Sequence, residues 1–493
     1  MSECETKQDP LVLGVRLLTA ALSCLALAAA AGLAIERIVY PYEIGYGEGG
    51  LLHTALRVAH GGGAYSPTQE LPYVPNVYGP LYPYAWSLFA RWCGASWWPG
   101  RLIATLAAVA VSVCLYLAVR AVTKDRWAGV IAVALFVSSW PMRTWVGLAR
   151  VDLPAVALAM TGVLLTTGRR PWLQWLGVVC FIAAVFTKQS MVAAPVAVCV
   201  WYAARREWRL SVTRSGAWAA ASLATFLVLN LVTRGAAWRE MVMGNVNPWH
   251  LAVARQYFAE YVRHEGYGVM LGLTAALVLM ADSSVALFGL YAAAAGLVAV
   301  SVGKDGSDVN YFIETAAVVA VLCGFGLYRR GLFPTTDRRA LIAWLLACAL
   351  LAPGLKATIY EARHVRDDEN CARAVELAVA NAPGPVFGDA LGAVIRAGKT
   401  VWTEPFVTTL MANAGSWDQG ALLRMIEDER FALIVTERDW GDHADRRTSA
   451  PASRLTVEQI QMVDAHYRQS REVGRWHLLV PAGRGSDLGS RRR

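Results

Sequence analysis

Two carboxylates, Glu43 and Glu48, lie among glycines and tyrosines in the segment 42–50, directly after a first long apolar stretch. A carboxylate can act as a general base that takes the proton of an attacking hydroxyl group. The neighbouring glycines would let a substrate approach the backbone closely. Acids also favour helix N-termini, so either residue could instead cap a helix that begins near Gly49. The local pattern alone leaves both interpretations open.

A further acid, Asp152, follows Arg150 and precedes Pro154 at the start of a later apolar stretch. This order is typical of a helix start, with the acid as a cap and proline in the first turn. It would also suit a second acid that orients an acceptor or a metal, with the arginine in contact with a phosphate group. Both interpretations are kept.

Two lysines stand in short polar segments between apolar stretches. Lys188, followed by Gln189, lies in a turn where a lysine often only extends toward the membrane interface, but its ammonium group would suit a lipid-linked phosphate. Lys304 begins the segment 304–314, which is rich in hydrogen-bonding groups. Glycine, aspartate and serine dominate ordinary turns, so a plain polar turn is the competing interpretation.

The composition places these residues in a membrane protein. Hydrophobic residues make up 56% of the 493 positions and charged residues only 17%, and the apolar residues are gathered in separate stretches up to about residue 357. The stretch 11–35 alone is long enough to cross a hydrocarbon core of about 30 Å. We therefore predict an all-α polytopic membrane protein. The net charge of +9 is attributed to arginine and lysine in the loops, which is a topology signal and not a sign of nucleic-acid binding.

Four basic loops fix the predicted topology. They contain Arg120 to Arg126, Arg169 and Arg170, Arg205 to Arg214, and Arg329 to Arg339, and we place them in the cytoplasm. This predicts about eleven spans, a cytoplasmic N-terminus and a first outer loop over 36–100, whose proline- and tryptophan-rich part 80–100 is expected to lie at the interface. The spans are 11–35, 101–119, 127–146, 153–168, 172–187, 190–204, 215–234, 266–281, 284–302, 312–328 and 340–357.

Beyond residue 357 the charge density rises and the apolar runs become short. We predict a transmembrane domain over 1–357, a small extracytoplasmic α/β domain over 358–482 and a disordered tail over 483–493. Strands are expected near 385–388, 400–403, 431–435 and 477–480, with helices at 370–381 and 418–429 between them.

The cysteines show no CxxC pair and no His/Cys metal spacing, so no zinc or redox site is predicted. A divalent cation between Glu48 and Asp152 is possible because hard cations favour carboxylates, but the spacing does not require it. Few ionisable groups lie near span centres, where an ion-coupled transporter would be expected to place them.

Together these features resemble the GT-C superfamily of membrane glycosyltransferases, and most of all its bacterial protein-mannosyltransferase and aminoarabinose-transferase branch. The resemblance covers roughly residues 11–357. This chain departs from the branch in one respect, because Gly47-Glu48 stands where an Asp, often Asp-Glu, is usual. The matching residues are Glu48, Ala55 with Arg57, Gly61 to Tyr65, Tyr78 to Pro83, Arg150 with Asp152, Thr187 to Gln189, and Asn310 to Glu314.

The resemblance implies transfer of a sugar from a polyprenyl-phosphate donor to a lipid, glycan or protein acceptor at the outer face of the bacterial cytoplasmic (inner) membrane. Glu48 would be the base that permits inversion at the anomeric carbon, with Glu43 as the alternative and Asp152 as a second catalytic acid. The donor phosphate would be bound by Lys188, Arg150, Lys304 and Arg57, and the substrates by Tyr65, Tyr78, Gln189, Asn310, Tyr311 and Glu314.

Three alternatives stay open at this point. A lipid or polysaccharide flippase or transporter should show a polar central cavity and internal repeats, and neither is visible in the sequence. A polysaccharide ligase or polymerase would use diphosphate-linked chains. A non-catalytic assembly protein would tolerate replacement of the acids.

Overall fold

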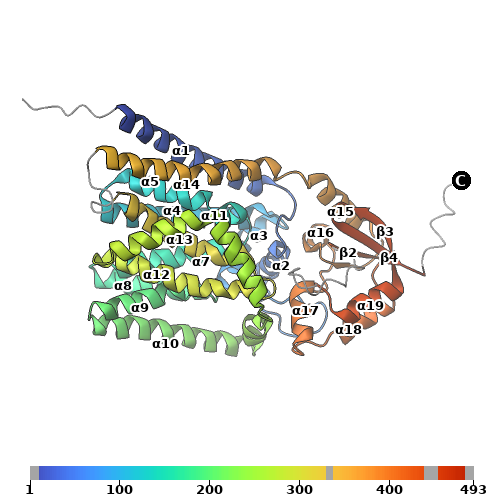
Figure 1. The fold of residues 1–493 in the computed structure, drawn as a ribbon. Helices are drawn as coiled ribbons and strands as arrows, with labels where there is room; N and C mark the ends of the chain where they lie inside the picture. The colour runs from blue at the N-terminus through green and yellow to red at the C-terminus, as the bar shows by residue number, and fades with distance from the viewer. Residues whose placement is uncertain (1–9, 329–336, 438–453, 484–493) are drawn as a thin grey trace, which may run out of the picture.

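Apolar helices with few charges build most of the molecule. The computed structural model describes residues 10–328, 337–437 and 454–483, so the predicted tail lies outside the described residues except for its first position. The helices run roughly along one direction as a bundle, and a smaller α/β region stands at one end of it (Figure 1).

Within the described part of the chain, every predicted span overlaps at least one helix. Six segments are long and apolar enough to cross a membrane by length and composition, and four shorter apolar helices lie beside them. The protein is therefore a helical multi-pass membrane protein. The helices of the bundle are α1 (Pro10–Val39), α4 (Trp98–Thr123), α5 (Arg126–Ser138), α7 (Asp152–Thr166), α8 (Pro171–Val185), α9 (Ala193–Ala204), α10 (Trp208–Val232), α11 (Leu251–Val278), α12 (Ser283–Ala299), α13 (Ile313–Tyr328) and α14 (Asp337–His364).

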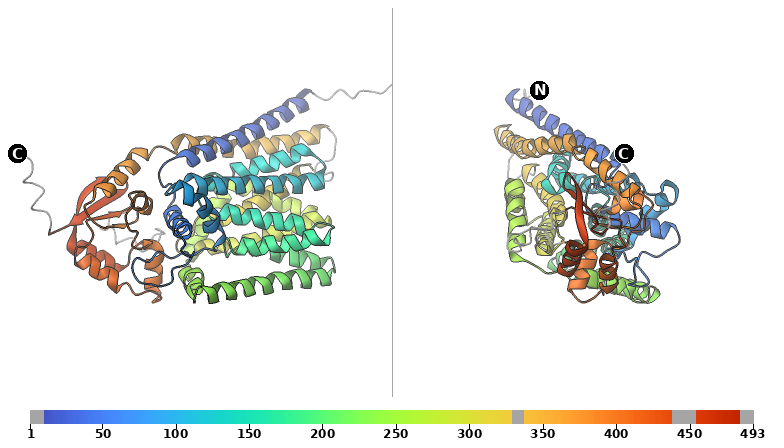
Figure 2. Two further views of the ribbon diagram at one scale, coloured as in Figure 1. Left: turned by 180° about the vertical axis from the view of Figure 1, so that it is seen from behind. Right: turned by 90° about the vertical axis from the view of Figure 1, so that its right-hand side faces the viewer.

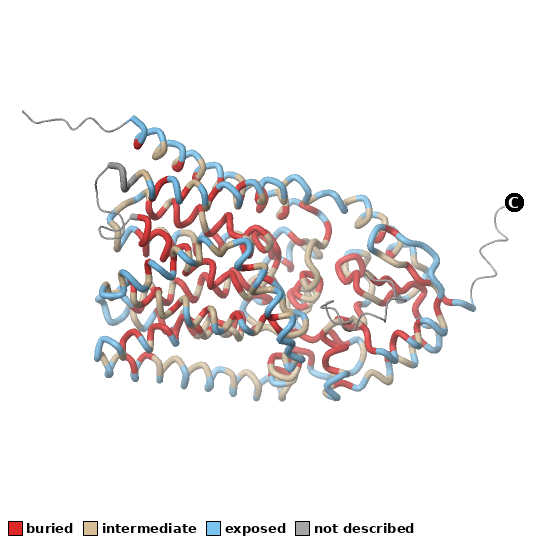
Figure 3. Tube along the Cα trace, viewed as in Figure 1, coloured by how far each residue is buried: buried red, intermediate tan, exposed pale blue. Residues whose placement is uncertain are grey.

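Burial separates the centre of the bundle from its edges. The helix α13 is buried along most of its length, whereas only Ser211 and Arg214 are buried in α10. The helices α1 and α14 pack along one edge, and α10 lies at the opposite edge with its apolar side chains exposed (Figures 1 and 3). Exposed apolar helix faces are expected where lipid is the solvent.

Short helices and turns occupy the end of the bundle that faces the α/β region. Figure 2 shows the short helices that follow α1 in the chain between the bundle and the α/β region. A break at Ser139, whose backbone is extended, divides the predicted span 127–146 into α5 and a separate short helix. The elements at this end are α2 (Glu48–Ala59), α3 (Leu81–Cys93), α6 (Trp140–Trp145), η1 (Trp238–Val242), η2 (Met243–Asn245), η3 (Val300–Gly303) and η4 (Val309–Phe312).

The α/β region contains a sheet with the strand order β1-β2-β4-β3, in which β1 and β2 are parallel and the other pairs are antiparallel. Its buried core includes Phe387, Ile434 and Leu479. The elements are α15 (Glu369–Asn381), β1 (Val386–Gly388), α16 (Leu391–Arg396), α17 (Pro405–Asn413), α18 (Gly420–Glu427), β2 (Leu433–Thr436), α19 (Val457–His466), β3 (Tyr467–Val473) and β4 (Trp476–Pro481).

One strand prediction is wrong, and one strand was not predicted. The segment 400–403 forms no strand, and only Thr403 makes an isolated bridge, to Tyr73 of the first loop. The strand β3 was not predicted, because only its two end residues are buried and the five between them are exposed. That pattern lacks the alternation by which a half-buried strand is recognised.

Candidate active site

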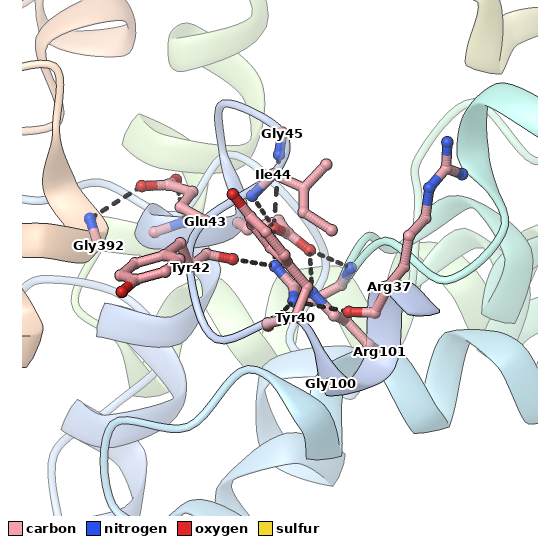
Figure 4. Close-up of polar contacts among 12 residues, drawn as sticks. Arg37, Tyr40, Tyr42, Glu43, Ile44, Gly45, Gly100, Arg101 and Gly392 are labelled. Atoms are coloured by element: carbon pink, nitrogen blue, oxygen red, sulfur yellow. Dashed lines mark hydrogen bonds and ion pairs between the residues drawn. The ribbon is translucent and has the colours of Figure 1, made fainter. Parts of the chain in front are cut away.

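The carboxylate of Glu48 is completely buried and held by an arginine from another helix. Arg101, in the first turn of α4, donates from Nε to Oε1 at 3.0 Å and from Nη2 to Oε2 at 2.8 Å. The remaining guanidinium hydrogens reach the carbonyl oxygens of Arg37, Tyr40 and Tyr42 (Figure 4). This bidentate pair ties the end of α1 to the starts of α2 and α4.

Backbone amides complete the environment of Glu48. Its Oε1 accepts from the amide of Ala149 at 2.6 Å, and its Oε2 accepts from those of Ile44 at 2.9 Å and Gly45 at 3.4 Å. Burial alone would raise the pKa of Glu48, but the charge and hydrogen bonds of Arg101 and these amides outweigh it and hold the pKa below its usual value. With five donors directed at it, this carboxylate has little capacity left for a substrate proton.

Asp152 is the centre of a second buried cluster. Its Oδ1 accepts from Lys188 Nζ at 2.6 Å and from Asn310 Nδ2 at 2.7 Å, and its Oδ2 accepts from Trp145 Nε1 at 2.7 Å. These four residues come from α7, the turn after α8, η4 and α6. The structure thus brings together residues that are up to 165 positions apart in the sequence, from Trp145 to Asn310.

Arg150 joins this cluster to the first loop. Its Nη1 donates to the carbonyl oxygen of Tyr46 at 2.6 Å, and its Nη2 donates to the hydroxyl of Tyr78 at 3.1 Å. The ammonium group of Lys188 lies 4.4 Å from the ring centre of Tyr311. Two buried polar atoms here, Arg150 Nε and Asn310 Oδ1, have no hydrogen-bond partner.

Glu43 occupies a different position from Glu48. Its Oε1 accepts from the amide of Gly49 at 2.8 Å, and its Oε2 accepts from the amide of Gly392 in α16 at 2.9 Å, as Figure 4 shows for Gly392. Burial raises the pKa of Glu43 to about 7, although the two amide hydrogen bonds oppose this effect. Glu43 also lines a cavity of about 180 Å³ between the first loop and the α/β region, together with Tyr40, Tyr42 and other residues.

Three predicted site residues instead organise the loop that follows α2. Arg57 donates to the carbonyl oxygens of Gly63, Ala64 and Val74 and to the hydroxyl of Ser66. The hydroxyl of Tyr65 donates to the carbonyl oxygen of Tyr78 at 3.0 Å, and Gln189 donates to that of Val77 at 2.8 Å. Their polar groups are engaged within the protein and hold the segment 63–78 beside the Asp152 cluster.

Two further predicted residues make no hydrogen bond or ion pair with Asp152, Lys188 or Arg150 among the described residues. Glu314 accepts from the hydroxyl of Tyr291 at 2.8 Å. The backbone of Lys304 forms an isolated bridge with Trp249, and its ammonium group makes no ion pair with another described residue.

The sequence interpretation missed several residues that complete these clusters. Arg101 and Trp145 were treated as parts of apolar stretches, although each makes a buried polar contact with a predicted acid. Glu240 was also missed; it accepts from the amides of Ser66 and Asn76, both at 2.7 Å. A charged residue at the end of an apolar stretch was the available signal for Arg101. In the described ranges, no group of three or more His, Cys, Asp or Glu side chains is arranged to hold a metal ion.

Comparisons with known proteins agree with this architecture. The family model described as dolichyl-phosphate-mannose-protein mannosyltransferase matches residues 75–233. The chain is similar in structure to ArnT from Cupriavidus metallidurans bound to undecaprenyl phosphate, with a TM-score of 0.62 and 10% identity over 92% of this chain and 97% of that one. No match is found among curated proteins.

Two other solved structures share the fold. ArnT from Cupriavidus metallidurans in the apo state gives a TM-score of 0.52 at 10% identity, again over 92% of this chain and 97% of that one. The Archaeoglobus fulgidus oligosaccharyltransferase in complex with zinc and sulfate gives 0.52 at 13% identity, over 84% of this chain and 67% of that one. The resemblance to GT-C membrane glycosyltransferases that the motifs indicate is therefore confirmed, through a family model over residues 75–233 and through a shared fold over most of the chain.

Proposed function

We propose that this chain is a glycosyltransferase that moves a sugar from a polyprenyl-phosphate donor to a lipid, glycan or protein acceptor at the outer face of the bacterial cytoplasmic membrane. The observation that carries the proposal is the convergence of Asp152, Lys188, Asn310 and Arg150 in one buried cluster. The similar ArnT structure was solved with undecaprenyl phosphate, which supports a polyprenyl phosphate as the donor lipid.

The proposed topology has eleven crossings and a cytoplasmic N-terminus. Arg120, Lys124, Arg169 and Arg205 lie at or next to the ends of their helices, opposite the ends that lead to Glu48 or into the Asp152 cluster. The positive-inside rule places such residues in the cytoplasm. The Asp152 cluster and the α/β region then belong to the outer side.

Arg150 and Lys188 are the proposed ligands of the donor phosphate. Each is a cation held in place by neighbours, and the free Nε of Arg150 is a hydrogen-bond donor without a partner. Such fixed cations stabilise the charge that develops on a departing phosphate. Asn310, Tyr78 and Tyr311 surround them as proposed substrate contacts. Arg57, Lys304 and Glu314 have a weaker claim, because their contacts do not reach these cations directly.

For the base we assign Glu43 and give Glu48 a positioning role. A general base works best with a pKa near the operating pH, and the pKa of Glu43 is about 7, whereas that of Glu48 is lowered. Glu43 also borders a cavity through which an acceptor can approach. The proposed base and the proposed phosphate ligand are both hydrogen-bonded to the segment 46–49. Glu43 accepts from the amide of Gly49, and Arg150 donates to the carbonyl oxygen of Tyr46.

In the proposed reaction the acceptor hydroxyl gives its proton to the Glu43 carboxylate as its oxygen attacks the anomeric carbon. The bond from that carbon to the phosphate oxygen breaks, and the polyprenyl phosphate leaves with the electron pair, with inversion at the anomeric carbon. A divalent cation between Glu48 and Asp152 stays a prediction. A cation bound there would have to compete with Arg101 for Glu48 and with Lys188 for Asp152, because these residues already neutralise the two acids.

The test is transfer of radiolabelled sugar from polyprenyl phosphate in proteoliposomes. We expect Glu43→Gln to lower the turnover by at least about a hundredfold, the size of a general-base contribution, while the variant binds the donor normally. Glu36→Gln, which changes an exposed acid in α1, is the matched control and should retain full activity. Unchanged transfer in Glu43→Gln would refute the assignment of the base. The proposed phosphate site would be refuted if Arg150→Gln and Lys188→Gln both bound the donor as tightly as the parent does.

A further inference from the structure

A second cavity lies inside the bundle, between α5, α11, α13 and α14, and has a volume of about 170 Å³. Figure 1 shows these four helices as neighbours in the upper part of the bundle. None of the residues assigned above to donor, acceptor or base lines it.

The polar side chains of this cavity gather where α5 gives way to α6. Arg143 is 7% exposed, and its Nη2 lies 3.5 Å from His264 Nδ1. The guanidinium makes no ion pair with another residue in the described ranges. A nearly buried cation whose hydrogens face a cavity is a site prepared for an anion.

Two more groups at this end have unused hydrogen-bonding capacity. Glu265 accepts from the amide of Trp140 at 2.6 Å through Oε1, which leaves Oε2 for a donor from a ligand. The hydroxyl of Ser138, in a residue that is 4% exposed, has no hydrogen-bond partner. Buried polar groups are rarely left unpaired, so these atoms point to a bound molecule with both acceptor and donor groups.

Most of the remaining lining is apolar and continues along two helices. Ala316, Val319, Ala320 and Cys323 form one stripe of α13, about 10 Å long at 1.5 Å per residue. The thiol of Cys323 donates to the carbonyl oxygen of Gly268 in α11 at the end away from Arg143. The cavity therefore has one polar end and one apolar end.

The cavity opens sideways between α11 and α14, because lining residues of both helices are exposed, namely Tyr267 on α11 and Ala349 and Pro353 on α14. On α11, Tyr267 is 80% and Met270 is 60% exposed, and on α14 Tyr360 is 63% exposed. In a membrane protein such faces meet lipid. A cavity of this volume has room for a polar headgroup and the first carbons of a chain, the rest of which would lie against these helix faces.

We infer that this cavity is a second lipid site, which binds an aminophospholipid apart from the polyprenyl-phosphate donor. The lipid phosphate accepts hydrogen bonds from Arg143, which His264 holds in place, and the ammonium group donates to Glu265. The acyl chain follows the α13 stripe. The pairing of one cation with one carboxylate at the polar end suits a zwitterionic head better than a phosphate monoester alone.

The test measures binding of phosphatidylethanolamine and of phosphatidylcholine to the purified full chain by native mass spectrometry. We expect phosphatidylethanolamine to bind more tightly, because phosphatidylcholine has no N–H donor for Glu265, and Glu265→Gln should remove most of that preference. Arg143→Gln should weaken binding of either lipid by at least about tenfold. Arg91→Gln, which changes an exposed arginine of α3, should bind as the parent does.

A second variant guards against misfolding at the buried arginine. Ala349→Trp places a large side chain at the exposed rim of the cavity and should block the lipid while leaving the fold intact. Normal binding in both Arg143→Gln and Ala349→Trp would overturn the inference. Competitive displacement by undecaprenyl phosphate would also overturn it, since the cavity would then be the donor site. Because lipid binding is measured without sugar transfer, a failure of the lipid site can be distinguished from a failure of the proposed transfer reaction.

Discussion

Replacement of Arg101 tests whether Glu48 positions the first loop or performs chemistry. Arg101→Met removes a fully buried guanidinium whose hydrogens go to Glu48 and to the carbonyl oxygens of Arg37, Tyr40 and Tyr42. The Glu48 carboxylate then stays buried without its counter-charge.

The expected cost follows from these contacts. Breaking a buried pair by removing one partner costs about 3–5 kcal/mol, and the three carbonyl oxygens that lose their donor place Arg101→Met at the upper end of that range. Glu48→Gln leaves Arg101 uncompensated and should fall at the lower end. Because the two residues are in direct contact, the double variant should be more stable than the sum of the single losses predicts, by as much as about 3 kcal/mol.

Denaturant titrations of the purified variants in detergent micelles supply these free energies of unfolding, with Glu36→Gln as the control. Limited proteolysis at 40–47 reports whether the loop has lost its fixed conformation. A free energy of unfolding for Arg101→Met within about 1 kcal/mol of the parent's would refute the positioning role of Glu48, because this difference is well below the range for buried pairs. The positioning role is refuted equally if Glu48→Gln is fully stable yet inactive while Arg101→Met transfers sugar, since Glu48 would then be the base.

Three other outcomes follow from the site. The kcat/KM for transfer should rise about tenfold per pH unit below pH 7 and level off above it, because the base must be ionised and the pKa of Glu43 is about 7; a profile with no limb near 7 would contradict its role. Lys188→Met should destabilise the protein by about 3–5 kcal/mol by leaving Asp152 unpaired, measured by the same titrations, and equal stability would show that the pair is not held in the native state. Gly79→Ala would place Cβ 1.8 Å from the carbonyl oxygen of Phe186, so we expect a large loss of folded protein in size-exclusion chromatography, whereas a normal elution profile would show that this close approach can relax.

The sequence was a good guide to the helices and a poor one to contacts between them. Long apolar stretches such as 101–119 have few alternatives to a helix in lipid, because every backbone group must find a partner within its segment. The break at Ser139 depends instead on a local extended backbone before Pro141, which an apolar average hides. The edge strand β3 escaped because its middle is exposed.

In the site, too, single residues could be predicted from the sequence, but contacts between distant residues could not. Asp152, Lys188 and Asn310 were selected separately as polar residues beside apolar stretches, and the fold brings Lys188 and Asn310 within hydrogen-bond distance of Asp152. The partner of Glu48 could not be found in this way, since Arg101 lies 53 positions further along the chain. Only the packing of α4 against the first loop distinguishes a saturated carboxylate from an available one.

The two hydrogen bonds of Glu43 also affect how firmly the membrane part and the α/β region hold together at the cavity. One carboxylate accepts hydrogen bonds from Gly49 of the membrane part and from Gly392 of the α/β region, so it links the two parts directly. Bonds from amides to a charged acceptor are stronger than those to a neutral one. When the proposed base takes up a proton, this one link between the two parts weakens, while the hydrogen bonds of Tyr73 to Trp402 and of Gln69 to Ser416 keep the α/β region beside the first loop. Proton uptake by Glu43 therefore changes the cohesion at the wall of the cavity and leaves the attachment of the α/β region in place.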